Sequence, residues 1–170
     1  MSRPVCSSSE RRFAVRGDSS WDVPEPELGI VLHRGEVVGY TIGNDVSSRD
    51  IEGKNPRYLP QSKVYDRCCS TGPCVSTPNS SKTRTTSQCH SPSSVTGKSS
   101  NGVSTSTSEM ATSCEKLVDY LCQHNNLPET LVLLTGTALV PPETFTLKEG
   151  DRVAIDIDNI GQLVNDTVVV

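Results

Sequence analysis

The stretch between Tyr65 and Leu117 contains no Leu, Ile, Phe, Tyr or Trp, and this gap constrains the fold of the chain more than any other feature. Serine and threonine dominate it from Ser76 to Ser108. A segment of this composition cannot bury enough apolar surface to offset the entropy lost on ordering, so we expect it to be disordered. The hydrophobic deficit of the chain is therefore concentrated in one place.

Length and charge narrow the class of protein. The chain has 170 residues, of which 34% are hydrophobic and 4% aromatic, which suits one domain with a modest core. Its net charge is -4, and Arg11 with Arg12 is its densest basic pair, so we expect no nucleic-acid partner. The polar N-terminus has no apolar signal segment and no later run reaches the length of a membrane span, so we expect a cytoplasmic protein.

The seven cysteines indicate reduced thiols, because their number is odd and no secretory signal precedes them. Cys68, Cys69 and Cys74 lie close together in the sequence, and Cys89 precedes His90. None of them has the paired C-x-x-C spacing that a tetrahedral zinc site favours, so a structural zinc site is not expected.

Three kinds of segment flank the serine- and threonine-rich stretch. Residues 1–13 form a polar leader that we expect to be disordered. Residues 27–32 and 37–42 read as two strands joined by a tight turn at 33–36, which predicts a hairpin. Ser113 or Thr112 can cap a helix that runs to about residue 125.

The apolar pattern of the C-terminal half predicts one helix and three strands. The helix has an apolar stripe at helical spacing, made of Leu117, Val118, Leu121 and Cys122. We expect a short buried strand at 131–134, a half-buried strand of period two at 152–157, and a closing strand at 163–170. The fold class is therefore α+β, rich in strands, with one clear helix.

The segment Val23-Pro24-Glu25-Pro26-Glu27 places two carboxylates side by side. Its prolines force an extended backbone, in which residues two apart point to the same face. Adjacent carboxylates repel unless a cation lies between them, and an all-oxygen ligand set suits Mg²⁺, Mn²⁺ or Ca²⁺ better than zinc. On its own, this pattern more often marks an acidic edge strand in solvent.

Several ordered motifs extend this pattern. Residues 39–50 read GYTIGNDVSSRD, residues 55–66 read NPRYLPQSKVYD, and GPC, STSTSEM, LTGT and VPP follow in that order. With these motifs the chain resembles the fumarylacetoacetate hydrolase family, and its 2-keto-3-deoxy-sugar-acid dehydratases look nearest. The resemblance runs from about Arg16 onward with one gap, and implies a β-rich mixed-sheet roll that is incomplete here.

The resemblance implies a role for five residues. The family's metal carboxylates fall on Glu25, Glu27 and Asp45, its active-site lysine falls on Lys63, and the substrate-holding Thr of its T-G-T turn falls on Thr137. It also implies Mg²⁺ as cofactor, a small 2-oxo acid as substrate and a homodimer as assembly. The expected reaction is a dehydration, or alternatively a carbon–carbon hydrolysis or decarboxylation, through a metal-stabilised enolate. Arg49 and Asp50, from the same motif, are interpreted as supporting residues.

Two departures from the family pattern leave alternatives open. Family members carry a longer N-terminal segment before the E-x-E motif, and their counterpart of residues 76–103 has alternating apolar residues. We hypothesise an altered reading frame between about Ser76 and Gly102, which translating the coding DNA in its other two frames would test. The chain is then either a metal-dependent enzyme or a non-catalytic remnant of one. The motif order disfavours a third alternative, a flexible interaction protein.

Overall fold

The computed structural model describes residues 12–77, 84–90 and 103–170, with the backbone alone for 84–90 and residue 103. In chain order its elements are β1 (Arg12–Val15), β2 (Asp22–Val23), β3 (Pro26–His33), β4 (Glu36–Asp45), β5 (Ser47–Ser48), α1 (Arg49–Glu52), the 3₁₀ turn η1 (Pro56–Tyr58), α2 (Leu59–Lys63), β6 (Cys69–Ser76), β7 (Arg84–His90), β8 (Val103–Ser106), the 3₁₀ turn η3 (Thr107–Glu109), α3 (Cys114–Cys122), β9 (Thr130–Leu134), β10 (Arg152–Ile157) and β11 (Gly161–Val169).

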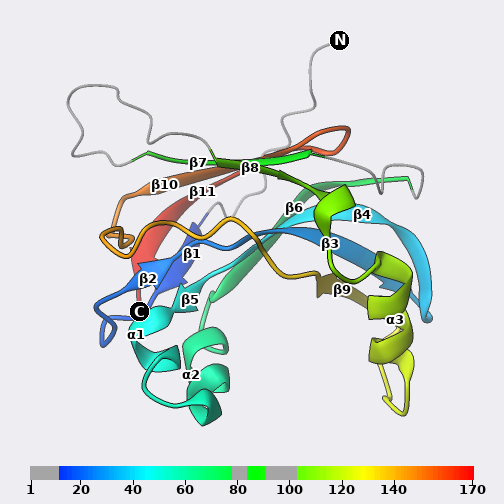
Figure 1. Cartoon of the computed structure of the whole chain (residues 1–170), viewed down its shortest axis with the longest axis horizontal. Coiled ribbons are helices and arrows are strands. Elements are labelled where there is room, and N and C mark those ends of the chain that lie inside the picture. The colour runs from blue at the N-terminus through cyan, green and yellow to red at the C-terminus, as the bar shows by residue number, and fades with distance from the viewer. Residues whose placement is uncertain (1–11, 78–83, 91–102) are drawn as a thin grey trace.

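The strands form two main sheets and one small ribbon (Figure 1). One sheet has the order β6-β4-β3-β9 and is antiparallel throughout. The other has the order β1-β11-β10-β7-β8, in which β1 runs parallel to β11 and the remaining pairs are antiparallel. The ribbon pairs β2 with β5, next to the short helices α1 and α2. The fold is therefore the predicted α+β, strand-rich class.

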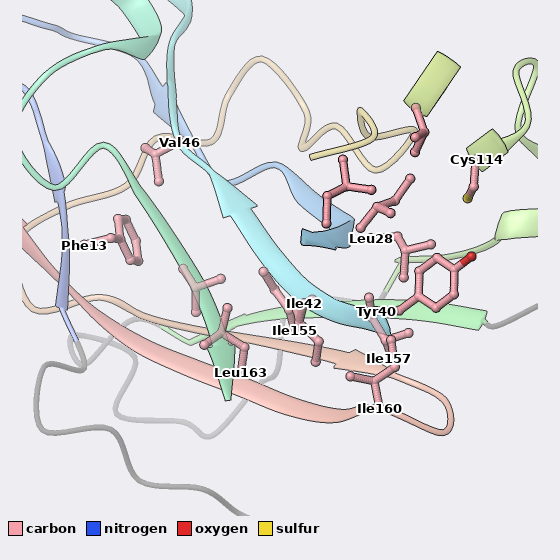
Figure 2. Close-up of a cluster of buried hydrophobic side chains, with 14 of the residues drawn as sticks. Phe13, Leu28, Tyr40, Ile42, Val46, Cys114, Ile155, Ile157, Ile160 and Leu163 are labelled. Carbon is pink, nitrogen blue, oxygen red and sulfur yellow. The ribbon is translucent and has the colours of Figure 1, made fainter. Parts of the chain in front are cut away.

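The main hydrophobic core combines side chains from both sheets (Figure 2). Leu28 and Ile42 come from the sheet that contains β3 and β4, and Ile155 and Leu163 come from β10 and β11. Burial alternates along β10, where every second residue is buried, as a strand with one core-facing side requires. The core thus fixes β3 and β4, whose ends carry the predicted metal carboxylates.

The predicted hairpin and helix are confirmed. β3 and β4 pair antiparallel around a turn at Arg34 and Gly35, which have φ angles of 51° and 83°. Such a turn matches the twist of the strands it joins. α3 begins after Ser113, whose hydroxyl accepts a hydrogen bond from the Lys116 N–H at 3.3 Å and so caps the helix. Cys122, predicted on the apolar stripe, is exposed.

The expectation of a disordered leader through Phe13 is wrong at its end. Phe13 lies in β1 and is fully buried in the core. β1 pairs in parallel with β11, at the far end of the chain. Pairing between segments so distant in sequence leaves no local pattern, so the composition of the leader could not reveal it. Residues 1–11 lie outside the described part of the chain.

The serine- and threonine-rich stretch also differs from expectation. Residues 84–90 form β7 and residues 103–106 form β8, both hydrogen-bonded into the larger sheet. Thr is a β-branched residue that suits a strand, and β10 supplies the backbone partners for β7. The expected disorder of residues 78–83 and 91–102 falls outside the described residues.

Two further observations complete the fold. β9, predicted to be buried, pairs on one side with β3, and its residues are half-buried or exposed because it ends the sheet. No helix among the described residues is long and apolar enough to cross a membrane.

Candidate metal centre

The β3–β4 pair brings three carboxylates together. Glu25 immediately precedes β3, Glu27 lies in it, and Asp45 is the last residue of β4. Because the two strands run antiparallel, the end of β4 returns to the start of β3, and the Asp45 N–H donates to the Glu25 carbonyl at 3.0 Å. Each residue offers one carboxylate oxygen, and these oxygens all lie within 4.8 Å of one another. That spacing could hold one metal ion.

Polar contacts fix the backbone of Glu25 and the carboxylate of Glu27. Asn44 is fully buried, and its side-chain oxygen accepts a hydrogen bond from the Glu25 N–H at 3.2 Å. A Glu27 oxygen accepts a hydrogen bond from the Gly136 N–H at 2.7 Å. Gly136 adopts a positive φ of 86°, which favours glycine, so the T-G-T turn can aim this N–H at Glu27. The positions of the carboxylates therefore follow from β3, β4 and the turn after β9.

Lys63 contacts two of the three carboxylates. Its Nζ donates to Glu25 at 2.6 Å and to Asp45 at 2.9 Å from the last turn of α2. Burial opposes the charge on Lys63, but its hydrogen bonds with Glu25 and Asp45 outweigh burial and raise its pKa. The lysine is therefore an ammonium ion near neutral pH and acts as a hydrogen-bond donor.

At Glu27, in contrast, burial opposes the charged form more strongly than the hydrogen bond to the carboxylate favours it. Burial raises its pKa to about 7, and the neighbouring charges of Asp45 and Glu25 add to that rise. The Gly136 N–H and Lys63 act in the opposite direction without cancelling it. A divalent cation among the three groups would favour all three charged forms, so the donor set fits a hard cation of the Mg²⁺ type. The residues present therefore fit the ion that the sequence implies.

The remaining predicted residue, Thr137, follows Gly136 in the turn. Its hydroxyl accepts a hydrogen bond from the Leu139 N–H at 3.1 Å, and it lines a pocket of about 130 Å³ together with Pro26. Thr137 therefore lies one residue from a direct contact to Glu27, and a substrate-holding role for it stays a prediction.

The sequence did not point to Trp21 or Glu52, which lie near the cluster, and it gave Arg49 only a supporting role. Arg49 lies with its Nε 4.0 Å from a Glu25 oxygen and its Nη1 3.4 Å from Glu52. Trp21, the single tryptophan of the chain, lines a cleft together with Arg49 and Glu52. The presence of a single tryptophan was the signal that could have drawn attention to Trp21, but no local pattern in the sequence connects it with Glu25.

Comparison with known proteins decides the family. Residues 25–169 match the family model described as fumarylacetoacetate (FAA) hydrolase C-terminal. The chain belongs to the fumarylacetoacetate hydrolase family. The matched range contains the three carboxylates, Lys63 and Thr137, and the family predicted from the motifs is confirmed.

The relatives of this hydrolase-family chain include sugar-acid dehydratases. A Haloferax volcanii protein named "Probable 2-keto-3-deoxyxylonate dehydratase" is 58% identical over 158 residues, which are 93% of this chain and 55% of that protein. A 2-dehydro-3-deoxy-D-arabinonate dehydratase of Saccharolobus solfataricus is 41% identical over 160 residues, which are 94% of this chain and 54% of that one. The chain thus spans about half the length of the curated relatives it matches.

A solved structure supports the fold. A 2-keto-3-deoxy-D-arabinonate dehydratase complexed with magnesium and 2,5-dioxopentanoate has a TM-score of 0.88 and 39% sequence identity with this chain. The match covers 95% of this chain and 58% of that structure. The expected fold of the fumarylacetoacetate hydrolase type is confirmed.

Proposed function

We propose that this chain carries the metal centre of a divalent-metal-dependent lyase that acts on a small 2-oxo acid, as a 2-keto-3-deoxy-sugar-acid dehydratase does. The observation that carries the proposal is the cluster of Glu25, Glu27 and Asp45, whose oxygens lie within 4.8 Å of one another, with Lys63 hydrogen-bonded to Glu25 and Asp45. The magnesium in the solved dehydratase supports Mg²⁺ as the ion, and Mn²⁺ or Ca²⁺ would suit the same oxygens.

The three carboxylates would hold the ion, and the extended segment around Pro26 keeps Glu25 and Glu27 from separating. When bound, the ion would act as a Lewis acid that draws electrons from the 2-oxo group and acidifies the neighbouring C–H. Dehydration of a 2-keto-3-deoxy acid removes a proton from carbon 3 and a hydroxyl from carbon 4, and the hydroxyl leaves as water once protonated.

We assign to Lys63 the role of hydrogen-bond donor or proton donor in this reaction. Its Nζ lies beside Glu25 and Asp45, so a protonated Lys63 can donate a hydrogen bond to an oxygen that gains negative charge, or a proton to the leaving hydroxyl. Thr137, next to the turn that contacts Glu27, is assigned to holding the substrate.

Thermal unfolding with Mg²⁺ and oxalate tests the centre, because oxalate mimics the enolate form of a 2-oxo acid. We expect both ligands together to raise the unfolding temperature, since binding to the native state alone stabilises it. Glu27→Gln should abolish the rise, whereas the exposed Glu149→Gln should preserve it. A temperature that does not respond to the ligand pair would refute the metal centre.

The alternative is a remnant that retains the carboxylates without turnover. It keeps its place because the chain spans about half the length of its dehydratase relatives. Proton NMR of a 2-keto-3-deoxypentonate solution separates the two. Appearance of the dehydrated product supports the enzyme, and a Mg²⁺–oxalate response without product supports the remnant.

A further inference from the structure

Two adjacent cysteines lie at the start of strand β6, beside the metal centre. Cys69 is the first residue of β6 and is exposed, and Cys68, directly before it, is half-buried. Both are free thiols, and their side chains are hydrogen-bonded to each other. The two sulfurs therefore lie close enough to bind one atom between them. None of the roles assigned above uses this pair.

Backbone contacts hold the pair in place without help from the thiols. Arg67 adopts a positive φ of 57°, and the Cys68 N–H donates to the Tyr65 carbonyl at 3.2 Å, which closes the turn before β6. On the other side, the Cys68 carbonyl accepts a hydrogen bond from the Val46 N–H at 3.1 Å. Replacing either thiol by a hydroxyl should therefore leave the backbone where it is.

Two thiols that meet form a ligand set for a soft atom with two free bonds. Soft sulfur ligands prefer soft metals and metalloids to Mg²⁺. Cys74, the next thiol along the chain, donates to the Ile160 carbonyl at 2.9 Å, so it does not extend the pair towards the four ligands of a structural zinc site. A trivalent arsenical that carries one organic group has two bonds left, which matches the two thiols.

The reaction of the pair with such an arsenical is a condensation. Two S–H bonds and the arsenic–oxygen double bond break, two arsenic–sulfur bonds form, and the oxygen leaves as water with both protons. Arsenic stays trivalent, so no oxidant or reductant is needed. Partial burial and the neighbouring Cys68 raise the pKa of the Cys69 thiol to about 11, which keeps it protonated near neutral pH. Alkylation and oxidation need the thiolate, whereas the condensation carries the protons away with the oxygen.

Cys69 lies next to one of the three carboxylates. The register of β4 and β6 places it opposite Asp45. Residues directly opposite in an antiparallel pair point to the same face, with Cβ atoms about 5 Å apart. Asp45 also accepts a hydrogen bond from Lys63 at 2.9 Å. An arsenic atom with an organic group on Cys69 would therefore compete for space with a metal ion held by Asp45.

From these contacts we propose that Cys68 and Cys69 form a dithiol site for trivalent organic arsenicals, and that occupation of this site weakens Mg²⁺ binding at Asp45. The dithiol site stands independently of the proposed function, whereas its effect on Mg²⁺ rests on that function. Coupling between two binding sites is reciprocal, so Mg²⁺ with oxalate must weaken arsenical binding by the same factor.

Phenylarsine oxide tests the site in the presence of excess glutathione, which displaces the arsenical from single thiols but not from a dithiol. Native mass spectrometry should show one phenylarsenic group per chain, and dimercaptopropanol should remove it. Cys68→Ser and Cys69→Ser should each lower retention about tenfold or more, because the second bond to arsenic is intramolecular only when both thiols are present. Cys122→Ser, which removes an exposed single cysteine on α3, is the matched control and should retain the group fully.

Calorimetric titration of Mg²⁺ in oxalate, with and without phenylarsine oxide, tests the coupling. The arsenical should weaken Mg²⁺ binding several-fold in the unmodified chain and leave it unchanged in Cys69→Ser. If Cys69→Ser retains the arsenical as well as the unmodified chain does, the whole proposal is overturned. Retention with an unchanged Mg²⁺ affinity overturns the coupling and supports the dithiol site. A chain that retains the arsenical but binds no Mg²⁺ overturns the proposed function together with the coupling, and again supports the dithiol site.

Discussion

At the scale of single residues, the pKa of Glu27 makes stability depend on pH. The folded-state pKa is about 7, raised by burial above the ordinary 4.5. Between these values the folded state binds more protons than the unfolded state, so the free energy of unfolding falls as pH rises. This contribution is complete below about pH 4.5, is lost above about pH 7 and amounts to about 3 kcal/mol at most.

Urea unfolding in EDTA across this range measures the effect. We expect Glu27→Gln to flatten the decline, because the amide does not titrate, and to be more stable than the unmodified chain at pH 8. The exposed Glu109→Gln should keep the slope. An equal slope in all three proteins would show that Glu27 titrates normally.

Lys63 should have opposite effects on turnover and on Mg²⁺ binding. Its ammonium donates to Glu25 and Asp45, which are two of the three proposed ligands, so it competes with the ion for their charge. We expect Lys63→Met to lower turnover about 100-fold or more, as loss of a proton donor does. Mg²⁺ affinity in calorimetry should hold or rise, while Lys148→Met, an exposed change, alters neither. A parallel loss of both would assign Lys63 to holding the centre together.

The carboxylates of the site could be predicted, and the geometry around them could not. The prolines on either side of Glu25 force an extended backbone, so Glu25 and Glu27 must point to the same face. This is a local property that can be predicted from the sequence. Their proximity to Asp45 depends on the pairing of β3 with β4, and Asp45 was predicted from the resemblance to the family motif alone. The Gly136 contact to Glu27 joins segments 109 residues apart, and no local pattern carries it.

At the scale of elements, the packing of β4 against β6 and β9 depends on glycine. A Cβ at Gly39 would lie 2.4 Å from the backbone oxygen of Ser76 in β6. A Cβ at Gly43 would lie 2.3 Å from Leu134 Cδ2, the mobile end of a side chain in β9. An alanine at position 39 would therefore require the backbone of β6 to move, whereas an alanine at position 43 would require only the Leu134 side chain to move.

This difference predicts unequal costs for one substitution. Gly39→Ala should lower the free energy of unfolding by about 1–3 kcal/mol, because strand β6 itself must shift. Gly43→Ala should cost less, because Leu134 can change rotamer. Denaturant unfolding of both variants provides the comparison, and a larger loss at Gly43 would mean that Leu134 is held as rigidly as backbone.

Elements whose pairing is local followed from periodicity, and the others did not. The hairpin, α3 and β10 each show a complete apolar pattern in their own residues. β1 and β7 have short or polar sequences and are ordered by partners far along the chain. Composition describes what a segment can do alone, so it predicted disorder where the sheet supplies the missing interactions.

At the scale of the whole molecule, β7 is a polar strand within a sheet that has an apolar face. β7 lies between β10 and β8, and the register places Ser87 opposite Ile155 and Gln88 opposite Ala154. Ile155 is buried at 1% exposure, whereas Ala154 is half-buried. Residues directly opposite in an antiparallel pair share a face of the sheet, so position 87 belongs to the core-facing set by register.

An apolar residue at position 87 should therefore recover part of the missing core. We expect Ser87→Val to raise the free energy of unfolding by about 0.2–1 kcal/mol, the range of a favourable cross-strand pair. That gain corresponds to an increase of roughly 1–4 °C in the unfolding temperature. Gln88→Val adds a similar β-branched residue opposite the half-buried Ala154 and should gain less. If the two substitutions stabilise equally, the gain reflects strand propensity alone. A larger gain at position 87 would mean that the polar tract weakens the core at β10, as an altered reading frame in this segment would.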